Sequence, residues 1–242
     1  MAPRLAALVP RPIGFAHRGG KAHAPENSLA AFEAALASGA TGLESDARAT
    51  ADGSVVLHHG SRLRPSLRSP LRRPLRAARR EDLPASVLAP EELYESCGAG
   101  FEFSVDVKDP RAAPGLVAAA RRAGEGAAGR LWLCSPSLSV LGAWRQRWSD
   151  VRLVHSTRRR LMEHGPERLA ARLARSGIDA VNMPHGDWTG GTVVLFHRFG
   201  VQAFGWDAQY DRTLGDLLDA GIDAVYSDHV DRMVSAIARY YD

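Results

Sequence analysis

Strand-like and helix-like segments alternate along the whole 242-residue chain, and this alternation limits the fold more than any other feature. The strand-like segments are 13–16, 42–49, 101–108, 130–134, 151–155, 180–183, 201–206 and 224–227. The helix-like segments are 27–38, 112–123, 138–148, 167–176, 192–199, 213–220 and 230–240. With 54–58 as the hairpin partner of 42–49, we count eight strand–helix units. Such units imply a parallel sheet, and eight of them favour a single (β/α)8 TIM barrel. No glycine-rich dinucleotide or P-loop motif points to an open sheet.

One stretch interrupts the alternation. Residues 60–90 are rich in proline and arginine and have no clear period, so we expect a short basic irregular loop there, after the second strand hairpin. Residues 62–80 hold eight arginines and no acidic residue. The loop is either a solvated segment or a contact for anionic lipid. No second domain or repeat is visible, so we expect one barrel domain over 1–242.

Composition narrows the class of protein. Hydrophobic residues make up 45% of the chain, enough for one core, and no apolar run is long enough for a transmembrane helix. The apolar run 5–9 is too short for a signal-peptide core, so we expect a cytoplasmic protein. Only Lys21 and Lys108 of the 31 basic residues are lysine. They are either leftovers of codon bias or cations placed for chemistry.

The ends of the first two strands carry polar residues where a barrel places its catalytic groups. The first strand ends in His17-Arg18, followed by two glycines. The second carries Glu44 and Asp46, which share a face because residues two apart in a strand point the same way. Two neighbouring carboxylates repel each other unless a cation lies between them, and Mg²⁺ or Ca²⁺ suits oxygen ligands. The alternative, an acidic pair facing water, fits poorly with the apolar flanks.

Two further strand ends add to this set. His58 follows three apolar residues, and a second histidine allows one imidazole to take a proton while the other gives one. Asp106 and Lys108 again lie two apart. Asp106 would be a third metal carboxylate and Lys108 a phosphate-binding cation, unless the two form only a structural ion pair.

These motifs together resemble the glycerophosphodiester phosphodiesterase family. The resemblance rests on HRGG (17–20), PENS (25–28), ESD (44–46), TADGSVVLH (50–58) and VDVK (105–108). Trp206 and the segment 226–228 are similar to the last two strand ends of the family. The resemblance implies a (β/α)8 barrel with a divalent metal, Mg²⁺ or Ca²⁺. By resemblance the catalytic pair is His17 and His58, the metal ligands are Glu44, Asp46 and Asp106, and the substrate-binding residues are Arg18, Lys108 and Trp206.

Some positions depart from the family pattern or stay unassigned. His59 follows His58 where the family usually has aspartate, Asp106 stands where glutamate is common, and Asp207 stands where threonine is frequent. Glu26 resembles a family glutamate near the metal, and Asn27 is expected to be a helix N-cap. The unassigned residues at strand ends are His155, His185, Asp187, Asp207 and Asp228.

The resulting expectation is a metal-dependent hydrolase, placed in lipid metabolism, that cleaves glycerophosphodiesters to sn-glycerol 3-phosphate and an alcohol through a histidine pair. One alternative is phospholipase D-like or sphingomyelinase D-like cleavage of phospholipids or lysophospholipids, with the basic loop touching anionic membrane. Another is a non-catalytic barrel that binds a phosphorylated ligand. Nucleic acid is not expected, because no aromatic residues interleave with the arginine cluster.

Overall fold

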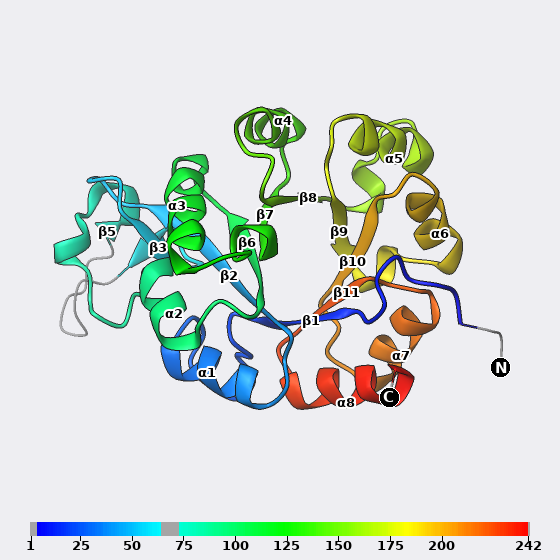
Figure 1. The fold of residues 1–242 in the computed structure, drawn as a ribbon, viewed down its shortest axis with the longest axis horizontal. Helices are drawn as coiled ribbons and strands as arrows, with labels where there is room; N and C mark the ends of the chain where they lie inside the picture. The colour runs from blue at the N-terminus through cyan, green and yellow to red at the C-terminus, as the bar shows by residue number, and fades with distance from the viewer. Residues whose placement is uncertain (1–3, 64–72, 242) are drawn as a thin grey trace.

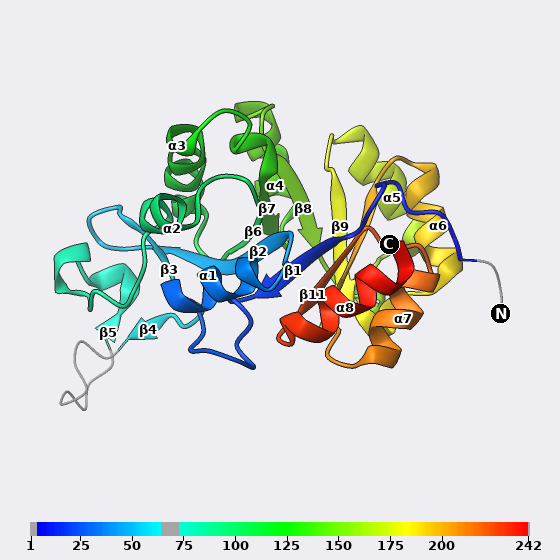
Figure 2. The same ribbon diagram turned by 60° about the horizontal axis from the view of Figure 1, so that its bottom comes forward.

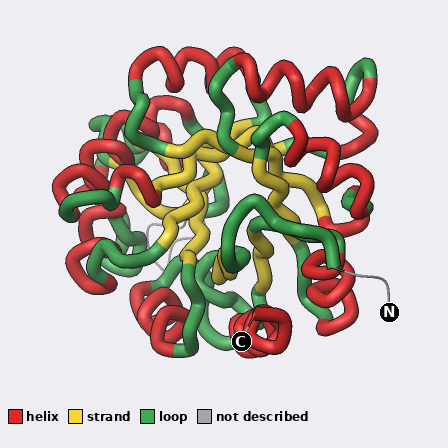
Figure 3. The backbone as a smooth tube through the Cα atoms, turned by 45° about the vertical axis from the view of Figure 1, so that its right-hand side comes forward, coloured by secondary structure: helices red, strands yellow, loops and turns green. Residues whose placement is uncertain are grey.

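The computed structural model describes residues 4–63 and 73–241. Eight parallel strands close into a barrel in the order β1, β2, β6, β7, β8, β9, β10, β11, and β11 returns to β1. Their bounds are β1 Ile13–His17, β2 Gly42–Ala49, β6 Glu102–Val107, β7 Leu131–Ser135, β8 Arg152–Ser156, β9 Ala180–Pro184, β10 Gln202–Trp206 and β11 Ala224–Ser227. Figure 3 shows the strands gathered in the centre with helices around them. The predicted TIM barrel is confirmed.

A helix follows each barrel strand (Figure 1). The helices are α1 Leu29–Ala37, α2 Pro90–Cys97, α3 Ala113–Ala123, α4 Leu138–Arg147, α5 Gly165–Arg175, α6 Gly190–Arg198, α7 Asp211–Asp219 and α8 Val230–Tyr241. The sequence analysis missed α2. This short helix follows the irregular stretch 60–90, but it has start signals: Pro90 opens it, and the Glu92 carboxylate accepts a bond from the Ala89 N–H at 2.6 Å. No helix in the described ranges 4–63 and 73–241 could cross a membrane.

The start of α1 corrects one prediction. Asn27 does not cap the helix; Ser28 does, and its hydroxyl accepts a hydrogen bond from the Ala31 N–H at 3.3 Å. Asn27 adopts a left-handed conformation with φ 55° and accepts a bond from the buried Ser45 hydroxyl at 2.8 Å. Its backbone N–H donates to the Arg18 carbonyl. Asn27 therefore ties the first loop to strand β2.

The segment after β2 is more regular than expected. β3, Val55–Leu57, pairs antiparallel with β2 as predicted. Within 60–90, the two-residue strands β4, Arg62–Leu63, and β5, Arg73–Pro74, pair with each other, and two single 3-10 turns follow at 75–77 and 80–82. Strands β4 and β5 lie to one side of the barrel (Figure 2). Arg64, Arg68 and Arg72 of the arginine cluster lie outside the described residues.

Aromatic side chains fill the inside of the barrel. Phe15 of β1 stacks on Tyr226 of β11 with ring centroids 4.7 Å apart, and Phe204 of β10 packs against Phe15 at 5.9 Å. Trp132 of β7 meets Phe204 at 5.0 Å. Because side chains in a strand alternate, Phe15 and His17 share the inward face of β1. The interior is thus a packed floor, and polar residues stand above it at the carboxyl ends of the strands.

Candidate active site

A cavity of about 610 Å³ opens at the carboxyl ends of the barrel strands. Each of the eight barrel strands contributes at least one inward-facing residue to its lining. These residues are His17, Glu44, Asp46, Ser104, Asp106, Cys134, Ser156, Asn182, Trp206 and Tyr226. Loop residues complete the wall: Arg18, Lys21, His59, Lys108, Thr157, Arg158, Arg160, Leu161, Asp207 and Gln209. The cavity therefore brings together every predicted site residue except His58.

A tight turn after β1 positions His17 and Arg18. Arg18, Gly19 and Gly20 all have positive φ, at 51°, 83° and 83°. A Cβ on Gly20 would lie 2.6 Å from Val230, so only glycine fits there. The turn aims the Arg18 N–H at Glu44 Oε2, 3.0 Å away. A strained arginine backbone held in this way is typical of a functional loop.

His17 stands between two carboxylates. Its Nδ1 lies 2.5 Å from Asp228 Oδ1 and its Nε2 lies 3.8 Å from Glu44 Oε2. Burial disfavours the charged imidazole, but Glu44 and the hydrogen bond to Asp228 outweigh it, so the pKa of His17 is raised. Since the Asp228 carboxylate accepts, Nδ1 carries a proton and Nε2 is the atom that can exchange one with a substrate. The sequence analysis left Asp228 unassigned, although it closes strand β11.

Acidic and basic groups alternate across the adjoining wall. Burial raises the pKa of Glu44 to about 7, and the nearby charges of Asp46 and Asp106 add to this effect. The Lys108 ammonium pairs with Asp106 and, at 3.2 Å, with Asp46 Oδ1. Burial opposes the charge of Lys108, but the two aspartates prevail and raise its pKa. Arg18 Nε lies 3.3 Å from Asp46 Oδ2, yet neither atom has a hydrogen-bond partner.

These carboxylates suit a divalent cation. Asp46 has a side chain only 3% exposed, and its Oδ2 lacks a hydrogen-bond partner. The high pKa of Glu44 shows that the positive charges present do not compensate its burial. All-oxygen donors match Mg²⁺ or Ca²⁺. In this structure Glu44, Asp46 and Asp106 do not place one carboxylate oxygen each within 4.8 Å of one another. The Lys108 ammonium forms ion pairs with both aspartates.

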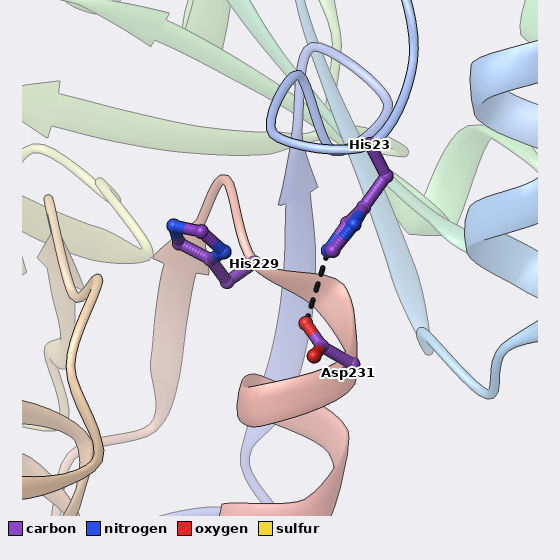
Figure 4. Close-up of side chains that lie close together, drawn as sticks. All are labelled: His23, His229 and Asp231. Atoms are coloured by element: carbon purple, nitrogen blue, oxygen red, sulfur yellow. Dashed lines mark hydrogen bonds and ion pairs between the residues drawn. The ribbon is translucent and has the colours of Figure 1, made fainter.

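A different group of residues, outside the cavity, does meet that distance. His23, His229 and Asp231 place one ligand atom each within 4.8 Å, the one such trio among the residues described (Figure 4). His23 Nε2 and Asp231 Oδ1 already form an ion pair at 3.0 Å, and both side chains are exposed. This trio joins the loop after β1 to the first turn of α8.

His58 and His59 stand at the corner where β3 meets β2. The His58 N–H donates to the Asp46 carbonyl at 2.8 Å, which extends the antiparallel pairing and sets His58 opposite Asp46. His58 Nδ1 lies 2.9 Å from the Gly60 carbonyl. A carbonyl only accepts, so Nδ1 carries a proton, and Nε2 is the nitrogen left to exchange one. His59 lines the cavity, and burial lowers its pKa.

Both lysines of the chain lie in this cavity. Lys21 Nζ is 3.4 Å from Asp228 Oδ2, and Lys108 pairs with Asp46 and Asp106. Arginine supplies every other basic side chain except histidine. The convergence of both lysines on one site favours placement for chemistry over codon bias.

The predicted substrate residue Trp206 lines the cavity at the end of β10, with the Arg158 guanidinium 5.0 Å from its ring centroid. Sequence reasoning missed Arg158 and Arg160, which follow β8, and the floor formed by Ser104, Cys134 and Tyr226. The Ser104 hydroxyl bonds Tyr226 at 2.9 Å. Their positions at the inward face of strands were the available signal.

The other acidic and histidine residues near the rim that the sequence pointed to lie as follows. Glu26 pairs with Arg18 at 2.8 Å and does not line the cavity. Asp187 Oδ2 accepts a bond from the Arg159 N–H at 2.8 Å. Asp207, with φ 63°, lines the cavity and accepts a bond from Gln209. His155 faces away from the barrel interior, and His185 forms part of a 3-10 turn after β9.

Comparison with known proteins matches the first third of the chain most clearly. Residues 17–97 match the model of the Glycerophosphoryl diester phosphodiesterase family. A Glycerophosphodiester phosphodiesterase of Bacillus altitudinis is 51% identical over 49 residues, 20% of this chain and 20% of that protein. Glycerophosphodiester phosphodiesterase 1 of Homo sapiens is 56% identical over 45 residues, 19% of this chain and 14% of that protein. The chain thus aligns with a fifth or less of these relatives.

Solved structures share the whole fold at low identity. A glycerophosphodiester phosphodiesterase from Thermotoga maritima has a TM-score of 0.78 and 22% identity, covering 93% of this chain and 97% of that one. A phosphodiesterase from Oleispira antarctica, in complex with the product sn-glycerol-3-phosphate, has a TM-score of 0.74 and 18% identity, covering 94% and 97%. The predicted resemblance is therefore confirmed: residues 17–97 match the model of the Glycerophosphoryl diester phosphodiesterase family, and the chain has the barrel fold of solved structures that bear this name.

Proposed function

We propose that this protein hydrolyses glycerophosphodiesters to sn-glycerol 3-phosphate and an alcohol. The observation that carries the proposal is the placing of His17 between Asp228 and Glu44, beside Asp46, Asp106 and Lys108, at the mouth of the barrel. His17, Glu44 and Asp46 of this set lie within the segment that matches the family model. The Oleispira antarctica neighbour, which holds sn-glycerol-3-phosphate as product, supports the same substrate class.

We assign the proton transfers by the protonation of the two histidines. Because the Nδ1–H of His58 faces the Gly60 carbonyl, Nε2 is the atom that holds the lone pair in the neutral imidazole, and in this proposal it takes the proton of the attacking water. The raised pKa of His17 favours the imidazolium, so Nε2 of His17 gives a proton to the departing alcohol. The O–P bond to the alcohol breaks as the new O–P bond forms. Asp228 keeps the His17 ring oriented through Nδ1.

Cations of the chain bind the phosphate in this proposal. The Lys108 ammonium and the Arg18 guanidinium both stand beside Asp46, and each can turn an N–H toward a phosphoryl oxygen. Glu44, Asp46 and Asp106 would hold a divalent cation, supported by the unpartnered Asp46 Oδ2 and the high pKa of Glu44. A bound Mg²⁺ or Ca²⁺ supplies neutralisation of charge on the phosphoryl oxygens.

The test is release of sn-glycerol 3-phosphate from a glycerophosphodiester by the whole protein. We expect His17→Ala and Asp46→Asn each to lower kcat/KM by about a hundredfold or more. His185→Ala is the matched control for His17→Ala, because His185 also lies at a barrel strand end but, unlike His17, does not line the cavity and belongs to the 3-10 turn after β9. Full activity in His17→Ala would overturn the mechanism. Binding of the diester with no hydrolysis would favour a non-catalytic barrel, and cleavage of lysophospholipid alone would favour the phospholipase D-like or sphingomyelinase D-like alternative.

A further inference from the structure

The cavity has an acidic wall, which carries Glu44, Asp46 and Asp106, and an arginine wall, which carries Arg158 and Arg160. Around the barrel, β8 is the fourth strand from β1 in either direction, so the loop after β8 lies across the mouth from His17. This loop carries three consecutive arginines, 158 to 160, and two of them, Arg158 and Arg160, line the cavity. A diester held at His17 would therefore extend toward these two guanidinium groups.

Arg158 and Arg160 differ from the other cations of the cavity because no carboxylate neutralises them. Arg18, Lys21 and Lys108 each form an ion pair with an acidic side chain. Within the described residues, neither Arg158 nor Arg160 forms an ion pair. Arg158 instead lies over the Trp206 ring, 5.0 Å from its centroid, which limits its conformational freedom and leaves its N–H donors for a ligand.

The positive charge continues beyond the cavity. A neighbouring cavity of about 780 Å³ shares Ser156, Thr157 and Leu161 with the first. Its lining adds Arg168, Arg172 and Arg175 of helix α5 or its end, and a single carboxylate, Glu163. Across the described part of the chain these three arginines also form no ion pair. The loop after β8 is thus flanked by unneutralised guanidinium groups on both sides.

From this charge distribution we infer that the preferred substrate carries a second anionic group, a carboxylate or phosphate, on its alcohol moiety, bound by Arg158 and Arg160. The inference rests on the proposed function and specifies its substrate class. Glycerol carries no charge, so an anion at the β8 wall must belong to the alcohol that leaves. Guanidinium groups bind carboxylate and phosphate through paired hydrogen bonds, and the stacked Arg158 is already oriented for this.

Two synthetic diesters of equal chain length test the inference. One joins sn-glycerol 3-phosphate to propan-1-ol and the other to 3-hydroxypropanoate, so they differ only by a terminal methyl or carboxylate. We expect the wild-type kcat/KM to be about tenfold higher for the carboxylate ester, mainly through KM. The ratio should fall as ionic strength rises, because both arginines are exposed to solvent and salt screens exposed charges.

Variants test whether Arg158 and Arg160 cause the preference for the carboxylate ester. In the double variant Arg158→Gln, Arg160→Gln the ratio between the two esters should fall to about one. The single variant Arg160→Gln serves if the double variant lowers Tm. Arg159→Gln is the matched control: Arg159 lies between the two but does not line either cavity, and its contact to Asp187 uses the backbone N–H. It should keep the wild-type ratio.

The outcomes separate this inference from the proposed function. Hydrolysis of both esters with equal kcat/KM in the wild type would overturn the inference and leave the proposed function standing. An equal loss for both esters in the double variant would place the arginines on the scissile phosphate and overturn it too. Hydrolysis of neither ester would overturn both proposals.

Discussion

Two histidines on opposite sides of the barrel, His17 in β1 and His155 in β8, have pKa values shifted in opposite directions. His17 ends β1, faces inward and lies between Asp228 and Glu44, which raise its pKa despite its burial. His155 lies in β8 across the barrel and faces outward. Burial, helped by the charge of Arg172, lowers the pKa of His155 to about 4, against the weaker effect of a hydrogen bond to the Ser135 backbone. His17 therefore holds its proton more tightly than a free imidazole, whereas His155 stays neutral near neutral pH.

The comparison separates two tasks. Strands β1, β2 and β6 carry the acidic wall, so hydrogen bonding between strands fixes the positions of His17, Glu44, Asp46 and Asp106. A loop after β8 carries the arginine wall, where side chains are more exposed and insertions are tolerated. Bond cleavage needs fixed geometry and is common to every diester, whereas recognition of the alcohol can vary. We therefore expect changes in the acidic wall to affect all diesters alike.

The largest effect should come from the histidine pair beside β3. We expect His58→Ala to lower kcat by about a hundredfold to a thousandfold for both esters, because it removes the proton acceptor. His59→Ala, one residue away, should cost less than about tenfold, since within the described residues only the backbone carbonyl of His59, and not its imidazole, has a hydrogen-bond partner. Steady-state kinetics of the two variants shows which of the two histidines contributes more to kcat. The reverse order would move the catalytic role to His59.

An effect on stability should come from His155. Its pKa is lower in the folded state, so below pH 6.5 the unfolded chain binds more protons and folding weakens as pH falls toward 4. The free energy of unfolding should fall by up to about 3 kcal/mol across this window from this group alone. Urea unfolding at several pH values measures it. His155→Gln should flatten the dependence, and an unchanged slope in this variant would refute the assignment.

A smaller effect should come from the kind of cation at β6. Lys108→Arg keeps the charge but replaces a compact ammonium between Asp46 and Asp106 with a larger planar group. We expect kcat/KM to fall by about tenfold for the propyl and the carboxylate ester equally. Lys21→Arg, with one partner at 3.4 Å, should lose less than about threefold. A changed ratio of kcat/KM between the two esters in Lys108→Arg would contradict the claim that the acidic wall acts on all diesters alike.

Strand periodicity predicted the barrel and most of the acidic wall. Side chains alternate in a strand, so Glu44, Asp46 and Asp106 could be placed on the inward face before the structure was known. Lys21, Arg158 and Arg160 could not be placed in this way, because they lie in loops whose path depends on tertiary packing. Helix α2 was missed because its eight residues form a weak periodic signal after an irregular stretch.

The direct test of cation-assisted diester cleavage is ³¹P NMR of a glycerophosphodiester incubated with the protein. The sample would be stripped with chelator and then given Mg²⁺ or Ca²⁺. The account predicts that the diester signal persists in the stripped sample and gives way to the monoester signal of sn-glycerol 3-phosphate after the cation is added. Conversion at the same rate in the stripped sample would contradict the role given to Glu44, Asp46 and Asp106. A diester signal that persists under both conditions would contradict the proposed activity itself.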